Sequence, residues 1–470
     1  MAVAVRSAIS HAGLSDLRDV PTLRVVNLLS WRYRDPARYL AEALGWTVGE
    51  TALTTMGGNS PQALVNLTAA EIQAGELDLA VLAGGECWRT RTRAKRQGQA
   101  LPWSTHLDHD AMLAPDRLIG DPGPMSNEAE TARGIVHPVQ IYPMFETTLR
   151  AAAGESLDDH RQRIAALWAR FAAVAATNPQ AWVRSAPTAE QIATPGPENR
   201  MIGLPYPKLM NSHNDVDQAA ALVMCSVGEA RRLGVAPDRW VFPIAGADAH
   251  EHEFVSDRHR FDETPAIRLG GRCALDLAGI GIDDIDLIDL YSCFPAAVQL
   301  GAASLGLGLD RQLTRTGGMA FAGGPWNDYV MHAIATVVGE LRAGVGQRAL
   351  VWANGGFATK HSFGIYSTAP PTAGFRTGSP QAEVDALPRR RLAAPVDAAG
   401  PATIEAYTVM HGRDGEPEMA IASCLLADGR RAWGTNSRSD VASALCDGEW
   451  VGRQLRLTAD GVLDLDGRRR

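Results

Sequence analysis

The chain alternates between continuous apolar runs and amphipathic segments, and this alternation predicts a layered α/β protein. Apolar side chains recur at helical spacing from Ser60 to Gly75, so we expect a helix there, capped by Asn59 or Ser60 and with Pro61 in its first turn. Residues 77–85 follow as an apolar run closed by two glycines, which is the pattern of a strand buried on both faces.

The same order of strand, glycine-rich turn and helix recurs in the second half of the chain. Residues 284–294 and 347–357 read as strands, Pro295 begins a helix, and a glycine-rich loop feeds a long helix within 316–344. Further helices are expected near the start of the chain, at 37–46, and at the end of 215–234. The repeat predicts a duplicated α/β architecture whose turns gather at the strand ends.

Three segments depart from this repeat. Residues 86–205 are rich in Arg, Pro, Trp and His, with one clear helix at 160–176. We interpret them as a long insertion into the first half of the protein that covers a site. Residues 368–400 have the Pro, Gly, Ala and Arg content of a linker. Short strand-like runs with Asp-Gly turns fill 402–460 and predict a small β-barrel.

These patterns divide the chain into four parts. We expect an N-terminal half at 1–214 with a loop domain at about 88–205, a C-terminal half at 215–368, a linker at 369–400 and a barrel at 401–470.

Composition narrows the class of protein. Hydrophobic residues make up 46% and charged residues 21% of 470 residues, which is ordinary for a globular protein, and the net charge of -8 argues against nucleic-acid binding. The six cysteines form no C-x-x-C pair, so neither a metal site nor a disulfide framework is indicated. No apolar run approaches the ~18 residues of a membrane span and no signal peptide is evident, so we expect a cytoplasmic protein.

Four glycine-rich or polar turns stand where ligands bind in such folds. Backbone N–H groups at the start of a helix can hold a phosphate, a carbonyl oxygen or a developing oxyanion. A single glycine turn more often serves only tight backbone geometry, whereas four turns placed alike in a duplicated frame are more informative. The four turns are Gly57-Gly58-Asn59, Tyr291-Ser292-Cys293, Gly323-Gly324-Pro325 and Asn354-Gly355-Gly356.

The order of these turns resembles the thiolase superfamily over roughly residues 1–368. The motifs are "GGNSPQALVNLTAAEIQAGELDLAVLAGGE", "DLYSCF", "AGGP" and "NGGF". Within this superfamily, the motifs are most similar to those of sterol-carrier-type thiolases and actinobacterial acetyl-CoA acetyltransferases. The resemblance implies a five-layered α/β/α/β/α core, a loop domain over the substrate and acyl-CoA as ligand. It extends weakly to the C-terminal barrel, which resembles oligonucleotide/oligosaccharide-binding-type barrels of bacterial acyl-CoA and steroid pathways.

The chain departs from the thiolase pattern at every catalytic position. The nucleophilic cysteine aligns with Gly57 or Gly58, and the second cysteine with Ala353 or Asn354. The two histidines of the family align with Tyr291 and Gly324. Because a thiolate nucleophile needs a cysteine beside a base, we expect cysteine-dependent thiolase chemistry to be lost.

The remaining candidates are N–H donors and a few polar side chains. As catalytic candidates we take Tyr291, Ser292 and Asn354. Tyr291 can donate, accept or transfer a proton, although a packed tyrosine is equally compatible with its place. As substrate-binding candidates we take Gly57, Gly58, Asn59, Gly323, Gly324, Asn354, Gly355 and His361. No metal and no cofactor are expected beyond a coenzyme A thioester as substrate or ligand.

Three functions follow from the resemblance. The first is a thiolase-like acyl-CoA-binding protein of the acyltransferase family that lacks cysteine chemistry. The second is a retro-aldol lyase that acts on a steroid or lipid side-chain acyl-CoA through Tyr291. The third is an acyl-CoA or lipid carrier without catalysis. We expect a monomer or homodimer, with an acyl-CoA pathway protein as a further partner.

The N-terminus departs from the family too. Thiolases begin with a strand and a full helix, whereas this chain enters midway through that helix. The resemblance implies either a misassigned start or a first sheet that is short by a strand.

Overall fold

The protein is built around two mixed five-stranded sheets. The structure is a computed structural model that describes residues 1–103 and 114–465. In the first sheet, strands β1 to β4 run parallel to their neighbours and β7 runs antiparallel to β3. The order is β4 (Arg117–Ile119), β2 (Thr47–Thr54), β1 (Asp19–Val25), β3 (Leu79–Cys87) and β7 (Asp217–Cys225).

The second sheet repeats this plan and adds strands at one edge. Its antiparallel strand β11 pairs with β10 on one side and with β8 on the other, while β9 and β10 are parallel. The order is β12 (Arg376–Gly378), β8 (Phe242–His250), β11 (Lys360–Ser367), β10 (Arg348–Gly355) and β9 (Leu287–Leu290).

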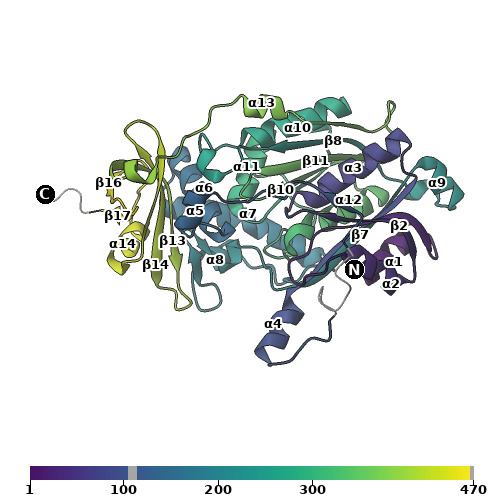
Figure 1. Ribbon diagram of the computed structural model, residues 1–470, viewed down its shortest axis with the longest axis horizontal. Helices are drawn as coiled ribbons and strands as arrows, with labels where there is room; N and C mark the ends of the chain where they lie inside the picture. The colour runs from purple at the N-terminus through teal and green to yellow at the C-terminus, as the bar shows by residue number, and fades with distance from the viewer. Residues whose placement is uncertain (104–113, 466–470) are drawn as a thin grey trace.

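Helices cover both sheets and fill the space between them, which gives five layers (Figure 1). Helices α1 (Ala2–His11) and α2 (Pro36–Leu44) pack on the outer face of the first sheet, and α10 (Pro265–Ala278) and α11 (Pro295–Leu305) contact the second. Helices α3 (Ser60–Ala74) and α12 (Tyr329–Arg342) contact strands of both sheets. This arrangement confirms the predicted five-layered α/β/α/β/α class.

A helical segment lies between β3 and β7 in the chain. It contains α4 (Trp88–Arg96), α5 (Glu128–Ala132), α6 (Pro138–Ala153), α7 (Leu157–Thr177), α8 (Ala189–Ala193) and the short strands β5 (Met201–Gly203) and β6 (Tyr206–Pro207). The sequence indicated only α7, because Pro143 interrupts the apolar pattern of α6.

The C-terminal residues form a separate antiparallel sheet at one end of the molecule, yellow in Figure 1. It comprises β13 (Gly400–His411), β14 (Pro417–Leu426), β15 (Arg431–Asn436), β16 (Gln454–Leu457) and β17 (Leu463–Asp464), with α14 (Ser439–Cys446) beside them. An isolated bridge from Thr435 to Val462 brings the two ends of the sheet together, as closure of a barrel requires.

Buried arginine and polar contacts attach this sheet to the core. Arg431 is fully buried and pairs with Glu405 at 2.8 Å, and its guanidinium donates to the carbonyl oxygens of Ser256 at 2.6 Å and Arg258 at 2.7 Å. Thr147 of α6 donates to the carbonyl oxygen of Tyr407 in β13 at 3.0 Å. The end sheet and the α/β core are therefore packed together.

Several predicted elements are present with small shifts, and others were not predicted. Helix α3 begins at Ser60 with Asn59 as N-cap and ends before Gly75, as expected. Strands β1, β2 and β8 were not predicted, and β12 falls within the expected linker at 369–400. None of the helices in residues 1–103 and 114–465 combines the length and apolar character needed to cross a bilayer.

Candidate functional site

Three of the four turns converge where strands of both sheets end. Gly57-Gly58-Asn59 leads from β2 into α3, Tyr291 follows β9, and Asn354-Gly355 closes β10. The glycines allow this convergence, because a Cβ atom on Gly58 would lie 2.5 Å from the carbonyl oxygen of Asn354. We call Gly57, Gly58, Asn59, Tyr291, Asn354 and Gly355 the turn cluster.

The phenol of Tyr291 fills the space that a side chain at position 58 would need. An ideal Cβ on Gly58 would lie 2.3 Å from Tyr291 Oη and 2.8 Å from its Cζ, distances that atoms do not adopt. The ring is held in place, since it packs edge-on against Tyr329 with ring centroids 5.8 Å apart. The absence of a side chain at 58 and the presence of the phenol at 291 are thus two parts of one packing arrangement.

The Tyr291 hydroxyl is buried and has no hydrogen-bond partner among the described residues. The residue as a whole is 7% exposed. Burial, together with nearby Cys293 and Tyr329, raises the pKa of Tyr291 well above its usual value of 10. The group therefore stays protonated and acts more readily as a hydrogen-bond donor than as a base.

Backbone donors face the same place. The N-terminus of α3 presents the N–H groups of Gly58 and Asn59, which have no partner within residues 1–103 and 114–465. A Cβ on Gly355 would lie 2.4 Å from Asn59 Oδ1, 3.1 Å from Gly58 N and 3.2 Å from Asn59 N. Glycine at 355 therefore leaves room for the Asn59 side chain beside these donors, and the helix N-terminus favours negative charge there.

Asparagine side chains frame the turn cluster. Asn327 accepts a hydrogen bond from Gly57 N at 3.2 Å and donates to the Asn27 carbonyl oxygen at 2.9 Å, which fixes the turn before α3. Asn354 donates through Nδ2 to Tyr142 Oη at 2.8 Å, while its own Oδ1 is buried and has no hydrogen-bond partner among the residues that the structure describes. An unpaired buried amide oxygen is costly, so a donor on a ligand would find a ready partner there.

Tyr142 and Asn327 belong to the site although the sequence did not single them out. Tyr142 comes from α6, accepts from Ala358 N at 3.0 Å and stacks on Phe294 at 4.8 Å. Its helix could have been found from Pro138 at the first turn and Gly154 at the end, which flank an apolar stretch. Asn327 gave no local signal, since its contact with Gly57 joins residues 270 positions apart.

Ser292 and Cys293 are occupied elsewhere. Ser292 Oγ lies 3.3 Å from Tyr329 Oη and accepts a hydrogen bond from Met319 N at 3.3 Å. Both contacts stabilise the turn. Cys293 is buried, and this burial raises the pKa of its thiol to about 12. The cysteine nearest to Tyr291 in sequence therefore holds its proton at neutral pH.

The other predicted residues lie outside the turn cluster. Gly323 faces Gln218 and Trp182, since a Cβ there would lie 2.3 Å from Gln218 Oε1, and Gly324 faces Asn214. His361 is fully buried and its Nε2 lies 3.2 Å from the Ala358 carbonyl oxygen. Burial lowers the pKa of His361 well below 6.5, so it is a neutral, packed side chain in this structure.

The site is electrically neutral. The polar groups of the turn cluster are amide, carbonyl and phenol groups. No group of three or more His, Cys, Asp or Glu in the described part of the chain is arranged to hold a metal ion. Its arrangement suits recognition of a carbonyl oxygen, and it lacks a thiolate with a base.

The duplicated five-layered core, with its turns brought together at the strand ends, is a thiolase-like fold. The chain is 33% identical to a solved structure described as a monomeric SCP2-thiolase like protein type 1 from Mycobacterium smegmatis. The match covers 97% of this chain and 91% of that chain, with a TM-score of 0.80. Residues 380–462 match the family model for the thiolase-like protein type 1 additional C-terminal domain. The chain therefore belongs to the SCP2-thiolase-like proteins of type 1.

A second solved structure is similar in fold alone. It is described as an Ltp2-ChsH2(DUF35) aldolase, with 21% identity, coverage of 78% of this chain and 91% of that chain, and a TM-score of 0.56. No curated protein matches the chain.

Proposed function

We propose that the protein binds an acyl-CoA thioester at the turn cluster and does not carry out cysteine-dependent thiolysis or Claisen condensation. The observation that carries this proposal is the pair Gly58 and Tyr291. By the family resemblance, position 57 or 58 is that of the nucleophile, and a phenol occupies the volume beside Gly58. Acyl transfer through an enzyme-bound thioester has no nucleophile at this position.

Three hydrogen-bond donors favour a bound thioester carbonyl. The N–H groups of Gly58 and Asn59 and the hydroxyl of Tyr291 border the same small space and are unpaired within the described residues. Donors preorganised in this way hold a carbonyl oxygen and stabilise negative charge that develops on it. The raised pKa of Tyr291 keeps its hydrogen available for this contact.

A retro-aldol lyase is the second candidate, and the free hydroxyl of Tyr291 is the observation that favours it. Such a lyase cleaves a carbon–carbon bond next to a β-hydroxyl, and the donors would stabilise the enolate that leaves. The abstraction of the hydroxyl proton needs a base. The raised pKa of Tyr291 opposes that role in the resting protein, so we rank binding without cleavage first.

The state of assembly and location belong to the same proposal. The similar protein from M. smegmatis is described as monomeric, and we propose a monomer here. The aldolase structure is described with a DUF35 partner, which makes an acyl-CoA pathway protein a reasonable additional partner. We propose that the protein works in the cytoplasm on acyl-CoA.

Calorimetric titration with a panel of acyl-CoAs, followed by mass spectrometry of the products, tests this proposal. Gly355→Ala should weaken binding at least tenfold, because its methyl group displaces the Asn59 side chain and lies against the Gly58 and Asn59 donors. Tyr291→Phe should weaken it several-fold through loss of one hydrogen bond. Tyr366→Phe is the matched control, because Tyr366 is bonded to Gln62 at 2.8 Å and is not part of the turn cluster.

The products separate the candidates. Unchanged acyl-CoA after incubation supports binding alone. Release of a carbonyl compound and a shortened acyl-CoA, abolished by Tyr291→Phe, would establish the lyase. Robust cleavage of acetoacetyl-CoA by CoA, or equal affinity of the Gly355→Ala and native proteins, would refute the proposal.

A further inference from the structure

The turn that follows Asn354 contains a residue in a strained conformation. Ala358 is buried and has a φ of 54°, in the left-handed region that residues with a side chain seldom adopt. Such a residue persists only where the surrounding structure holds it. Because Ala358 belongs to the turn that begins at Asn354, the groups that hold its backbone also limit the shape of the turn cluster.

Side chains from two distant segments hold the polar groups of Ala358. Its N–H donates to Tyr142 Oη at 3.0 Å, and the same oxygen accepts a hydrogen bond from Asn354 Nδ2 at 2.8 Å. Its carbonyl oxygen accepts a hydrogen bond from the Arg258 guanidinium at 2.7 Å. Tyr142 and Arg258 therefore fix both ends of this residue, and Tyr142 also fixes the Asn354 amide.

Arg258 is an unusual group to bury in this place. The residue is 1% exposed, and its other hydrogen bonds reach the Glu263 carbonyl oxygen at 3.2 Å and Thr264 Oγ1 at 2.5 Å. None of its hydrogen bonds reaches a carboxylate in the part of the chain that the structure describes. A buried charge without a paired countercharge is costly. The contact with Ala358 gives this arginine a role other than stability.

The C-terminal sheet holds the backbone from which Arg258 projects. Arg431 of β15 donates through Nη1 to the carbonyl oxygens of Val255 at 3.3 Å, Ser256 at 2.6 Å and Arg258 at 2.7 Å. Trp433 of the same strand donates through Nε1 to Ser256 Oγ at 2.9 Å. Two neighbouring side chains of the C-terminal sheet thus fix this short segment of the core.

The orientation of Arg431 is itself set within the C-terminal sheet. Glu405 of β13 accepts from Arg431 Nε at 2.9 Å and from Nη2 at 2.8 Å, which is a two-pronged pair of fixed geometry. This pair leaves Nη1 to reach the carbonyl oxygens of the core. An unbroken series of buried contacts therefore runs from β13 to the turn that follows Asn354.

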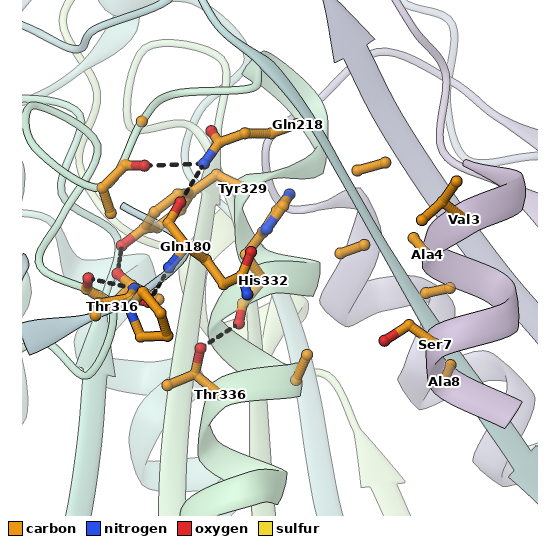
Figure 2. A pocket seen from close by; sticks show the side chains of 18 of the residues that line it. Val3, Ala4, Ser7, Ala8, Gln180, Gln218, Thr316, Tyr329, His332 and Thr336 are labelled. Atoms are coloured by element: carbon orange, nitrogen blue, oxygen red, sulfur yellow. Dashed lines mark hydrogen bonds between the residues drawn. The ribbon is translucent and has the colours of Figure 1, made fainter. Parts of the chain in front are cut away.

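The other side of the turn cluster is held without the C-terminal sheet. Tyr291 packs against Tyr329 with ring centroids 5.8 Å apart, and Tyr329 Oη lies 2.7 Å from Thr316 Oγ1. Figure 2 shows Tyr329 and Thr316 at a cavity of about 700 Å³ that Arg258 and Arg431 do not line. The series of contacts from β13 therefore acts on the Asn354 side of the turn cluster.

We propose that the C-terminal sheet shapes the acyl-CoA site through two buried arginines that act in series. Arg431 fixes the backbone at residues 255–258, and Arg258 carries this constraint to Ala358 and so to the Asn354 amide. Both are positioning residues, since neither belongs to the turn cluster. The inference rests on the proposed binding of acyl-CoA at the turn cluster.

Two measurements test the inference: acyl-CoA affinity by calorimetry, and hydrogen–deuterium exchange of peptides that contain Ala358. Arg258→Lys keeps the charge but lacks the planar fork that serves three oxygens at once. We expect this variant to weaken binding about fivefold and to speed exchange at Ala358 about tenfold. Arg431→Lys, one step further away, should change both quantities in the same direction by about threefold. Peptides that contain Thr316 and Tyr329 should exchange alike in all proteins.

Action in series makes a prediction of its own. Once Arg258→Lys has broken the link to Ala358, Arg431→Lys has no further constraint to remove. The double variant should therefore bind acyl-CoA within a factor of about two of Arg258→Lys alone, whereas independent effects would multiply.

Arg150→Met is the matched control. Arg150 of α6 is also a buried arginine that contacts the C-terminal sheet region, through an ion pair with Glu449, and it makes no hydrogen bond to residues 255–258. Its loss should lower the Tm while the affinity for acyl-CoA and the exchange at Ala358 stay as in the native protein. All proteins are compared at a temperature at which each is folded.

The outcomes separate this inference from the proposed function. Native affinity and native exchange in both Lys variants would overturn the inference, as would multiplied effects in the double variant or an equal loss of affinity in Arg150→Met. If the native protein binds no acyl-CoA, the proposed function fails. The exchange at Ala358 then decides alone, and unchanged exchange in Arg258→Lys and Arg431→Lys would overturn the control of this turn by the C-terminal sheet.

Discussion

The contact between Gly58 and Tyr291 can be measured as a coupling free energy, from the free energies of unfolding in a double-mutant cycle. Gly58→Ala adds one methyl group at a position where the backbone does not have a positive φ, so its cost is steric. That methyl group would lie 2.3 Å from Tyr291 Oη and 2.5 Å from the Asn354 carbonyl oxygen. The first group is on a buried ring and the second is backbone at the end of β10, so neither moves away freely. Overpacking of this kind costs about 1–3 kcal/mol, and we expect about 2 kcal/mol.

Shortening the side chain at 291 should relieve part of this cost. In a Tyr291→Leu background the hydroxyl and the far end of the ring are gone, but the Asn354 carbonyl oxygen remains. We therefore expect Gly58→Ala to cost about 1 kcal/mol there, which makes the coupling about 1 kcal/mol in the double-mutant cycle. Urea unfolding of the four proteins, analysed by linear extrapolation, measures both quantities.

Gly196→Ala is the matched control for the added methyl group. A Cβ on Gly196 would meet no atom within 4 Å, so the substitution should change the free energy of unfolding by less than about 0.5 kcal/mol. If Gly58→Ala is as neutral as Gly196→Ala, or costs the same with Leu and with Tyr at position 291, then the phenol does not occupy the volume beside Gly58. The phenol would then not block a side chain at position 58.

Three further predictions concern charge and thiol chemistry. Arg431→Ala leaves the mostly buried Glu405 without its ion-pair partner, so it should lower the free energy of unfolding in urea by about 3–5 kcal/mol. Arg430→Ala is the control, because its ion pair is partly exposed to solvent and its loss should lower the free energy of unfolding by at most about 1 kcal/mol. Burial raises the pKa of Asp289 to about 6, whereas the same group in the unfolded chain loses its proton near 3.8. The free energy of unfolding, relative to that of Asp289→Asn, should therefore fall by roughly 3 kcal/mol as the pH rises from 3.8 to about 6. A difference between the two proteins that does not change with pH would contradict this. Cys293, with a pKa near 12, should show no alkylation plateau below pH 9 in peptide-resolved iodoacetamide labelling, and a plateau near neutral pH would reveal an activated thiol.

The parts of the fold that could be predicted from the sequence are those with local signals. Helix α3 has Pro61 at its start and Gly75 at its end, and β3 and β10 are continuous apolar runs. Strand β2 was missed because its sequence "TVGETALT" mixes polar residues with a glycine, and only its place beside β1 and β4 makes it a strand. Pairing across a sheet depends on residues far apart in the chain, which local propensity does not report.

The candidate site likewise contains residues that local sequence patterns predicted and residues that they did not. The glycine turns were visible in the sequence, and three of the four meet in space. The fourth turn lies elsewhere, because Gly323 faces Gln218 and Gly324 faces Asn214. Their position depends on the path of the loop before α12, which no local sequence pattern predicts. Tyr142 illustrates the same limit, because its hydroxyl meets Asn354 across 212 residues of sequence.

The packing at Gly58 also bears on whether a nucleophile could be placed there. A Cβ at 58 would lie 2.3 Å from Tyr291 Oη, so a side chain at 58 and the phenol at 291 fit together only if one of them shifts. Restoring a cysteine at 58 would first displace the phenol. It would then supply a thiol without a base, if Tyr291 and Gly324 occupy the family's two histidine positions as the resemblance implies. The N–H donors at the start of α3 need none of these groups, because they belong to the backbone. Binding of a thioester, as proposed here, therefore needs no cysteine at 58, and we expect it to be separable from covalent chemistry.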